Sequence, residues 1–123
     1  MPDQPWVALT LVTTGAPEDA PLEVAAVRFR SLEPEDTFER LVRPPFDLPH
    51  LTQRRTGLGP GDVADTPTLT EVHHDLVAFL GNDPIVGERP ETVMERLTIG
   101  HLLLAPRCDL TALAALLLPS LVD

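Results

Sequence analysis

The sequence predicts an α/β domain with a mixed sheet, from three observations. Short apolar segments rich in β-forming residues come first, a helical segment follows, and another short apolar segment precedes further helical ones. The 123 residues suffice for one domain with one core. Fourteen prolines and seven glycines divide the chain into short pieces, without an internal repeat or a long linker. We therefore expect a single domain over residues 1–123, in the order β-β-β-α-β-α-α.

Three segments near the beginning are expected to form a meander. Trp6 to Thr13 is apolar on both faces, which is typical of a strand at the centre of a covered sheet. Leu22 to Arg30 alternates with a period of two, and Asp36 to Arg43 reads as a more exposed strand that ends at Pro44. Because short turns join these segments, neighbouring strands are expected to run antiparallel.

The remaining segments are expected to be mainly helical. A short helix is expected near Thr52 to Leu58. Thr68 opens the next helix in a capping-box pattern with Glu71, and Gly81 ends it. A very short strand, an acidic helical stretch and a capped leucine-rich helix then follow, at Pro84 to Gly87, Pro90 to Leu97 and Asp109 to Leu118.

Composition argues against several classes of function. The net charge is −10, and this acidity disfavours both phosphate-driven nucleic-acid binding and an anionic membrane surface. Aromatic residues make up only 4%, which is little material for a base-stacking platform. No apolar run approaches the ~20 residues that cross a bilayer. The single Cys108 excludes an internal disulfide, so a reducing cytoplasm is the expected location.

A resemblance to a known family covers about residues 6 to 97. The segment Ala8 to Gly15 resembles the first motif of the DEDDh-class 3′–5′ exonucleases, such as the epsilon subunit of DNA polymerase III, in which the strand reads hydrophobic-D-x-E-T-T-G. Further segments follow in the family's order, namely Pro21 to Val27, Phe38 to Pro44, Thr56 to Pro67 and Pro84 to Arg89. The resemblance implies an RNase H-like fold, with a parallel strand added to the meander and a shortened C-terminal end.

The same resemblance implies that the catalytic acids are missing. In the family, acidic side chains hold two metal ions, and two of these acids lie at i and i+2 on the first strand. Those positions are Thr10 and Val12 here, and the Asp of the second motif falls on Val93. The third motif would lie beyond Asp123. We expect no metal site, no cofactor and no nuclease activity, with Thr10 and Val12 as ordinary core residues of a central strand.

The remaining candidate binding residues form two groups. Thr13, Thr14 and Gly15 match family positions that hold a terminal nucleotide, although a turn alone would explain them. Six arginines could form a positive patch for an acidic partner or a few phosphates: Arg28, Arg30, Arg40, Arg43, Arg54 and Arg55. The preferred alternative is charge pairing with the interleaved acids Glu33, Glu35, Glu39 and Asp47.

The expected function is that of a catalytically inactive exonuclease-like domain, a structural or docking module of a DNA-repair or replication protein. Similar domains are fused to some DinG-like helicases of the XPD type, so the chain could be a fragment of an ATP-dependent DNA helicase. Its partner would be a protein or the remainder of that protein, with weak or indirect DNA contact. Two alternatives remain: an active exonuclease with unusual metal ligands, and an unrelated α/β interaction module, which a different topology would reveal.

Overall fold

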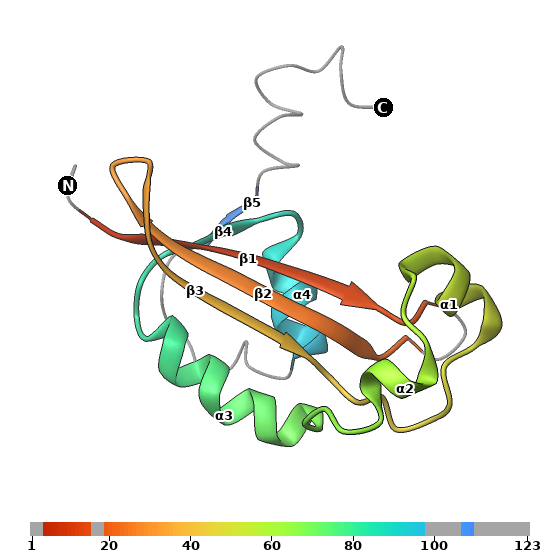
Figure 1. Ribbon diagram of the computed structural model, residues 1–123. Helices are drawn as coiled ribbons and strands as arrows, with labels where there is room; N and C mark the ends of the chain where they lie inside the picture. Colours follow the sequence, from red (N-terminus) through yellow and green to blue (C-terminus); the bar gives the residue numbers. More distant parts are fainter. Residues whose placement is uncertain (1–3, 16–18, 98–106, 110–123) are drawn as a thin grey trace, which may run out of the picture.

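A computed structural model describes residues 4–15, 19–97 and 107–109, which form an α/β domain (Figure 1). Its mixed sheet has five strands in the order β3-β2-β1-β4-β5. The strands are β1 Trp6–Thr13, β2 Pro21–Arg30, β3 Glu33–Leu41, β4 Ile85–Gly87 and β5 Arg107–Asp109. The helices are α1 His50–Thr56, α2 Pro60–Val63, α3 Leu69–Leu80 and α4 Pro90–Arg96. The predicted fold class is confirmed, and β1 occupies the central position that its apolar sequence indicated.

The first three strands form the predicted antiparallel meander. Leu9 of β1 lies opposite Ala26 of β2, which in turn lies opposite Phe38 of β3. Between β2 and β3, Ser31 and Leu32 both have positive φ (50° and 66°), as in the type I′ turns that match strand twist. Because this turn is so short, β3 extends from residue 33 to 41 rather than from 36 to 43 as predicted.

The other two strands add a parallel half to the sheet. Val7 of β1 pairs with Ile85 of β4, and β5 pairs in parallel with β4. A meander followed by a helix and a parallel strand beside the first strand is the topology that the exonuclease resemblance implied. Arg107–Asp109 was not predicted as a strand, because three residues show no periodicity. The predicted leucine-rich helix after Asp109 lies outside the described residues.

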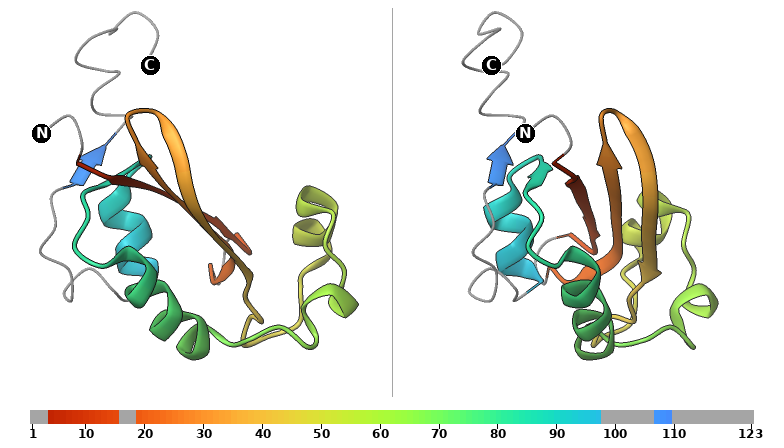
Figure 2. Two further views of the ribbon diagram at one scale, coloured as in Figure 1. Left: turned by 60° about the vertical axis from the view of Figure 1, so that its left-hand side comes forward. Right: turned by 90° about the vertical axis from the view of Figure 1, so that its left-hand side faces the viewer.

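Helices α3 and α4 lie together on one side of the sheet (Figure 2). The core between them includes Val7, Leu9, Val24, Ala26, Phe38, Val72, Leu76, Leu80, Ile85, Met94 and Leu97. The start of α3 is as predicted, since the Glu71 carboxylate accepts hydrogen bonds from the backbone N–H (3.3 Å) and the hydroxyl (3.0 Å) of Thr68. Val72, Leu76 and Leu80, the apolar stripe of α3, belong to this core and face the strands.

Helices α1 and α2 stand beyond the carboxyl end of β1 (Figure 1). A second, smaller cluster of Leu22, Leu48 and Val63 ties this region to the start of β2. Helix α1 begins two residues before the predicted Thr52 and ends at Gly57, which has φ 78°. Helix α2 was not predicted, because its four residues are too few for a helical pattern. In the described part of the chain, no helix is long and apolar enough to cross a membrane.

Replacing Gly87 with alanine is expected to lower the free energy of unfolding by about 1–3 kcal/mol, because the new methyl group would overpack the contact between β4 and β1. A Cβ at Gly87 would lie 2.7 Å from the Leu9 carbonyl oxygen. Urea unfolding followed by circular dichroism measures the loss. Gly61→Ala is the matched control, since its Cβ would meet nothing within 4 Å. Equal stability of the two variants would contradict the β1–β4 packing.

Candidate functional site

The parallel strands β1 and β4 end at the same edge of the sheet, and a pocket of about 480 Å³ opens there. We call it the strand-end pocket, and it is lined by Leu11, Thr13, Asp19, Glu88, Arg89, Thr92, Val93 and Arg96. A second hollow of about 420 Å³ shares Leu11, Glu88 and Val93 with it and continues along β1 to Ala8. Of the three positions at which the resemblance places catalytic acids, Val93 lines both hollows, Thr10 lines only the second and Val12 lines neither.

Thr10 and Val12 face away from the core. Thr10 is exposed, and Val12 is 37% exposed. The prediction that both are ordinary core residues is wrong, because alternate residues of β1 point to opposite faces and Leu9 takes the side covered by α3 and α4. The Thr10 hydroxyl lies 3.5 Å from the Ala25 carbonyl oxygen. Neither side chain is a carboxylate, so neither position offers the anionic oxygen that Mg²⁺ prefers.

Helix α4 brings the second predicted position to the same pocket. Val93 is half-buried and lines both hollows, while the exposed Thr92 lines the strand-end pocket alone. The helix starts here because Pro90 occupies its first turn after Arg89, which has φ 48°. The end of β1 and the start of α4 thus meet as the resemblance implies, with Val93 contributing an apolar side chain.

The carboxylates that line the pocket are Asp19 and Glu88, neither of which was among the predicted site residues. Asp19 Oδ1 accepts a hydrogen bond from the Gly15 N–H at 2.9 Å, and its Oδ2 lies 3.3 Å from Arg96 Nη1. Sequence gave no signal for Asp19, since it follows a turn rather than a motif. In the described part of the chain, no group of three or more His, Cys, Asp and Glu side chains is placed to hold a metal ion.

The pKa of Asp19 lies below its ordinary value of 3.8. The largest cause is a hydrogen bond from the Thr13 side chain, which favours the charged carboxylate, while partial burial acts in the opposite direction. The Gly15 N–H and the positive charges of Arg96 and Arg55 lower the pKa further. Asp19 is therefore held as an anion that is already engaged with its neighbours.

Asp19→Asn is expected to destabilise the chain at pH 7 and to have a smaller effect in acid. A carboxyl with a lowered pKa in the folded state contributes stability above its unfolded pKa, and this contribution is lost as the pH falls through the folded value. Urea midpoints of both proteins should therefore converge as the pH drops below 3.8. A difference that stays constant down to about pH 2 would show that ionisation of Asp19 is not involved.

The turn after β1 is held in place by α1. The Thr52 hydroxyl donates to the Thr14 carbonyl at 2.5 Å, and Arg55 Nη2 donates to the Thr13 carbonyl at 2.6 Å. Thr14 itself is buried, and its hydroxyl accepts a hydrogen bond from the Ala20 N–H at 3.0 Å. Of the three predicted nucleotide-binding residues, Thr13 lines the strand-end pocket. These contacts explain the turn structurally, and its role in nucleotide binding stays a prediction.

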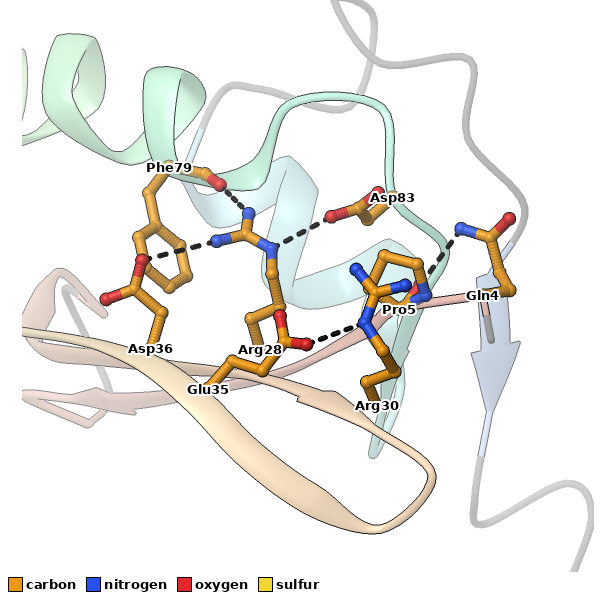
Figure 3. Close-up of polar contacts among 8 residues, drawn as sticks. All are labelled: Gln4, Pro5, Arg28, Arg30, Glu35, Asp36, Phe79 and Asp83. Carbon is orange, nitrogen blue, oxygen red and sulfur yellow. Dashed lines mark hydrogen bonds and ion pairs between the residues drawn. The ribbon is translucent and has the colours of Figure 1, made fainter. Parts of the chain in front are cut away.

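The two arginines of β2 are paired with acids (Figure 3). Arg28 Nε donates to Asp83 Oδ2 at 2.9 Å, Arg28 Nη1 lies 3.6 Å from Asp36 Oδ2, and its guanidinium donates to the Phe79 carbonyl and covers the Phe79 ring. Arg30 Nε lies 2.6 Å from Glu35 Oε1. Pairing with an interleaved acid, the preferred interpretation, is confirmed for Arg30 with Glu35, whereas Arg28 pairs with Asp36 and Asp83, which that interpretation did not name.

The other four predicted arginines do not join them in one patch. The strand register sets Arg40 opposite Val24, at the other end of β2 from Arg30. Arg40 covers the Phe38 ring at 4.5 Å, and Arg43 Nη1 lies 3.4 Å from the Ala64 carbonyl oxygen. Arg54 and Arg55 belong to α1, beyond the end of β1. The six arginines are thus distributed over three parts of the fold.

Comparison with known proteins identifies similarity to parts of PolC-type DNA polymerases III. No protein-family model matches the chain. It is 32% identical over 124 residues to a PolC-type DNA polymerase III of Oceanobacillus iheyensis, with 94% of the chain covered. It is 27% identical over 126 residues to that of Clostridium perfringens, with 97% covered. The chain spans only 9% of the length of each of these two relatives.

Solved structures that resemble the chain include several exonucleases. The chain matches exonuclease I with a TM-score of 0.73 and 15% identity, over 98% of the chain and 33% of that protein. For exonuclease X in complex with 5′ overhanging duplex DNA, the TM-score is 0.71 at 19% identity, over 93% of this chain and 64% of that protein. For the nuclease domain of 3′hExo, a DEDDh family member, the TM-score is 0.68 at 19% identity, over 81% of this chain and 59% of that protein. The chain therefore has an RNase H-like, exonuclease-like fold.

Proposed function

We propose that this chain is a non-catalytic exonuclease-like domain, which serves as a structural or docking part of a larger DNA-processing protein. One observation carries the proposal. On the open face of β1, at the i and i+2 spacing where the resemblance places two metal-binding carboxylates, the chain presents Thr10 and Val12. The two positions have the exposure that metal ligands need, and their side chains have no negative charge.

The chemistry of the remaining donors supports the same proposal. Two-metal nucleases use carboxylates to hold both ions against the scissile phosphate. In the strand-end pocket, Asp19 Oδ2 lies 3.3 Å from Arg96 Nη1, and Glu88 shares the pocket with the apolar Val93. A donor set of Thr10, Glu88 and an arginine-paired Asp19 does not fit a pair of divalent cations.

Membership of a larger protein is supported by the sequence comparison. The two polymerases align with nearly the whole chain but have only 9% of their own length in the alignment. A domain that accompanies DNA replication or repair enzymes agrees with this relation. A DinG-like helicase is one such parent, and a PolC-type polymerase is another.

An active 3′–5′ exonuclease with non-standard ligands is the second candidate. The observation in its favour is that Asp19 and Glu88 line one pocket at the end of β1. For this candidate, Glu88 would have to hold the metal ion with Asp19 released from Arg96.

Mn²⁺ titration by calorimetry separates the two candidates. For the wild-type chain we expect a dissociation constant in the millimolar range or weaker, because a neutral donor set holds a hard cation poorly. The double variant Thr10→Asp/Val12→Glu places two carboxylates on the open face of β1 and is expected to bind Mn²⁺ about tenfold more tightly or better. The control variant is Thr70→Asp, on the exposed start of α3, which adds a negative charge away from the pocket. Micromolar binding by the wild type that Glu88→Gln removes would contradict the proposal.

A further inference from the structure

Helix α1 carries an exposed surface beyond the end of β1 (Figure 1). Four residues of the helix line a shallow hollow of about 440 Å³, and we call them the α1 surface: His50, Leu51, Gln53 and Arg54. Residues three and four apart share a helix face, so Arg54 lies next to both Leu51 and His50. All three of these side chains are exposed.

This surface is cationic on an acidic chain. The net charge of the chain is −10, but α1 contains no acidic residue and has Arg54 and Arg55 in its last turn. Arg28, Arg30 and Arg96 form ion pairs with carboxylates. In the part of the chain that the structure describes, the side chain of Arg54 forms neither a hydrogen bond nor an ion pair. The charge of Arg54 is therefore available to an external anion.

The same surface includes an exposed apolar side chain. Leu51 is 77% exposed, whereas Leu76 and Leu80, the core leucines of α3, are fully buried. Covering an exposed leucine with another apolar group is favourable, since it removes apolar area from water. The α1 surface thus combines a cation with an apolar contact.

The helix that presents this surface is fixed to the rest of the fold. Thr52 is buried, and its hydroxyl donates to the Thr14 carbonyl at 2.5 Å. The Gln53 side chain donates to the Leu48 carbonyl at 3.0 Å, and Arg55 is bound to the Thr13 carbonyl. A preformed surface loses little conformational freedom when a partner binds, which favours its use for docking.

We propose that the α1 surface docks an acidic peptide segment of a partner protein, with an apolar side chain of that segment against Leu51 and a carboxylate on Arg54. Charge complementarity selects an acidic partner, and the exposed leucine selects one with an apolar group. The phosphate backbone of a nucleic acid meets the first requirement but has no apolar group to cover Leu51. The inference deepens the docking role and rests on it, but not on the absence of nuclease activity.

The test uses the whole chain and a fluorescein-labelled peptide, Glu-Asp-Leu-Glu-Asp-Phe-Glu, in a fluorescence anisotropy titration. We expect binding in the micromolar range, weakened about tenfold by Arg54→Glu and about fivefold by Leu51→Ser. Arg40→Glu and Leu32→Ser are the matched controls, because they make the same changes at exposed positions away from α1 and should alter affinity less than about twofold. Circular dichroism confirms that each variant is folded.

Four outcomes overturn the proposal. The peptide does not bind, or it binds equally well to Arg54→Glu and Leu51→Ser. A single-stranded oligonucleotide binds in its place and is released by Arg54→Glu, which assigns the surface to nucleic acid. Light scattering shows a dimer that Arg54→Glu dissociates, which assigns the surface to a second copy of the chain. None of these measurements involves cleavage, so their failure is distinct from a failure of the proposed lack of nuclease activity.

Discussion

Leu76→Ala is expected to lower the free energy of unfolding by about 3 kcal/mol, because it removes buried methyl groups and leaves a cavity. Leu76 is fully buried in the middle of α3, with Val72 one turn before it and Leu80 one turn after it. These residues form the stripe that packs against the sheet. The cavity is expected to persist, because α3 is connected to other elements at both of its ends and cannot shift freely to fill it.

The measurement is urea unfolding followed by circular dichroism. Leu51→Ala is the matched control, since it deletes the same atoms from a side chain that is 77% exposed, and its effect should stay within about 0.5 kcal/mol. A loss below about 1 kcal/mol for Leu76→Ala would contradict the packing of α3 on the sheet.

Arg28→Met is expected to lower the free energy of unfolding by about 2 kcal/mol, although methionine retains most of the apolar stem. The Arg28 side chain is 18% exposed, and it joins β2 to the end of α3 through Asp83 and the Phe79 carbonyl. Removing the guanidinium leaves the Asp83 carboxylate, which is 27% exposed, without its ion pair. Partial exposure of both partners keeps the loss below that of a fully buried pair.

A double-mutant cycle isolates the contact between Arg28 and Asp83. The loss for Arg28→Met/Asp83→Asn should be smaller than the two single losses added together, by about 1 kcal/mol. Arg40→Met is the control for loss of an arginine above a phenylalanine ring, because Arg40 covers Phe38 but is exposed. Strict additivity in the cycle would mean that the ion pair adds nothing to stability.

The strands and helices that were predicted with correct bounds are those whose sequence signals have a clear physical cause. Trp6–Thr13 was bounded correctly because an apolar run between polar turns has few alternatives as a strand. Helix α3 was bounded correctly because Thr68 and Glu71 begin it and Gly81 ends it. The start of β3 was missed because Ser31-Leu32 lacks the Gly or Asn that marks a type I′ turn.

The site was predicted in position but not in all its residues. The motif match brought Val93 to the strand-end pocket and Thr10 to the adjoining second hollow, because family spacing implies topology, but Val12 lines neither of them. It did not indicate that β1 exposes Val12, since a strand apolar on both faces was read as covered on both faces. Asp19 and Arg96 enter the pocket through tertiary contact across 77 residues, which no local pattern contains.

The missing patch of six arginines has the same explanation. Clustering in sequence between residues 28 and 55 predicted a joint positive surface, but the register of β2 and β3 separates the two strands' arginines. Acids from a different element, such as Asp83 after α3, neutralise Arg28. The unpaired charge of Arg54 could be recognised only once each arginine had been assigned its partners.

The central claim, an exonuclease-like domain without catalysis, is tested most directly by digestion of a 5′-labelled single-stranded oligonucleotide. The purified chain is incubated in excess over the DNA with Mn²⁺, beside an active DEDDh exonuclease and the Glu88→Gln variant. We predict that the oligonucleotide keeps its full length with the wild type and with Glu88→Gln. Stepwise shortening from the 3′ end by the wild type, lost in Glu88→Gln, would contradict the claim.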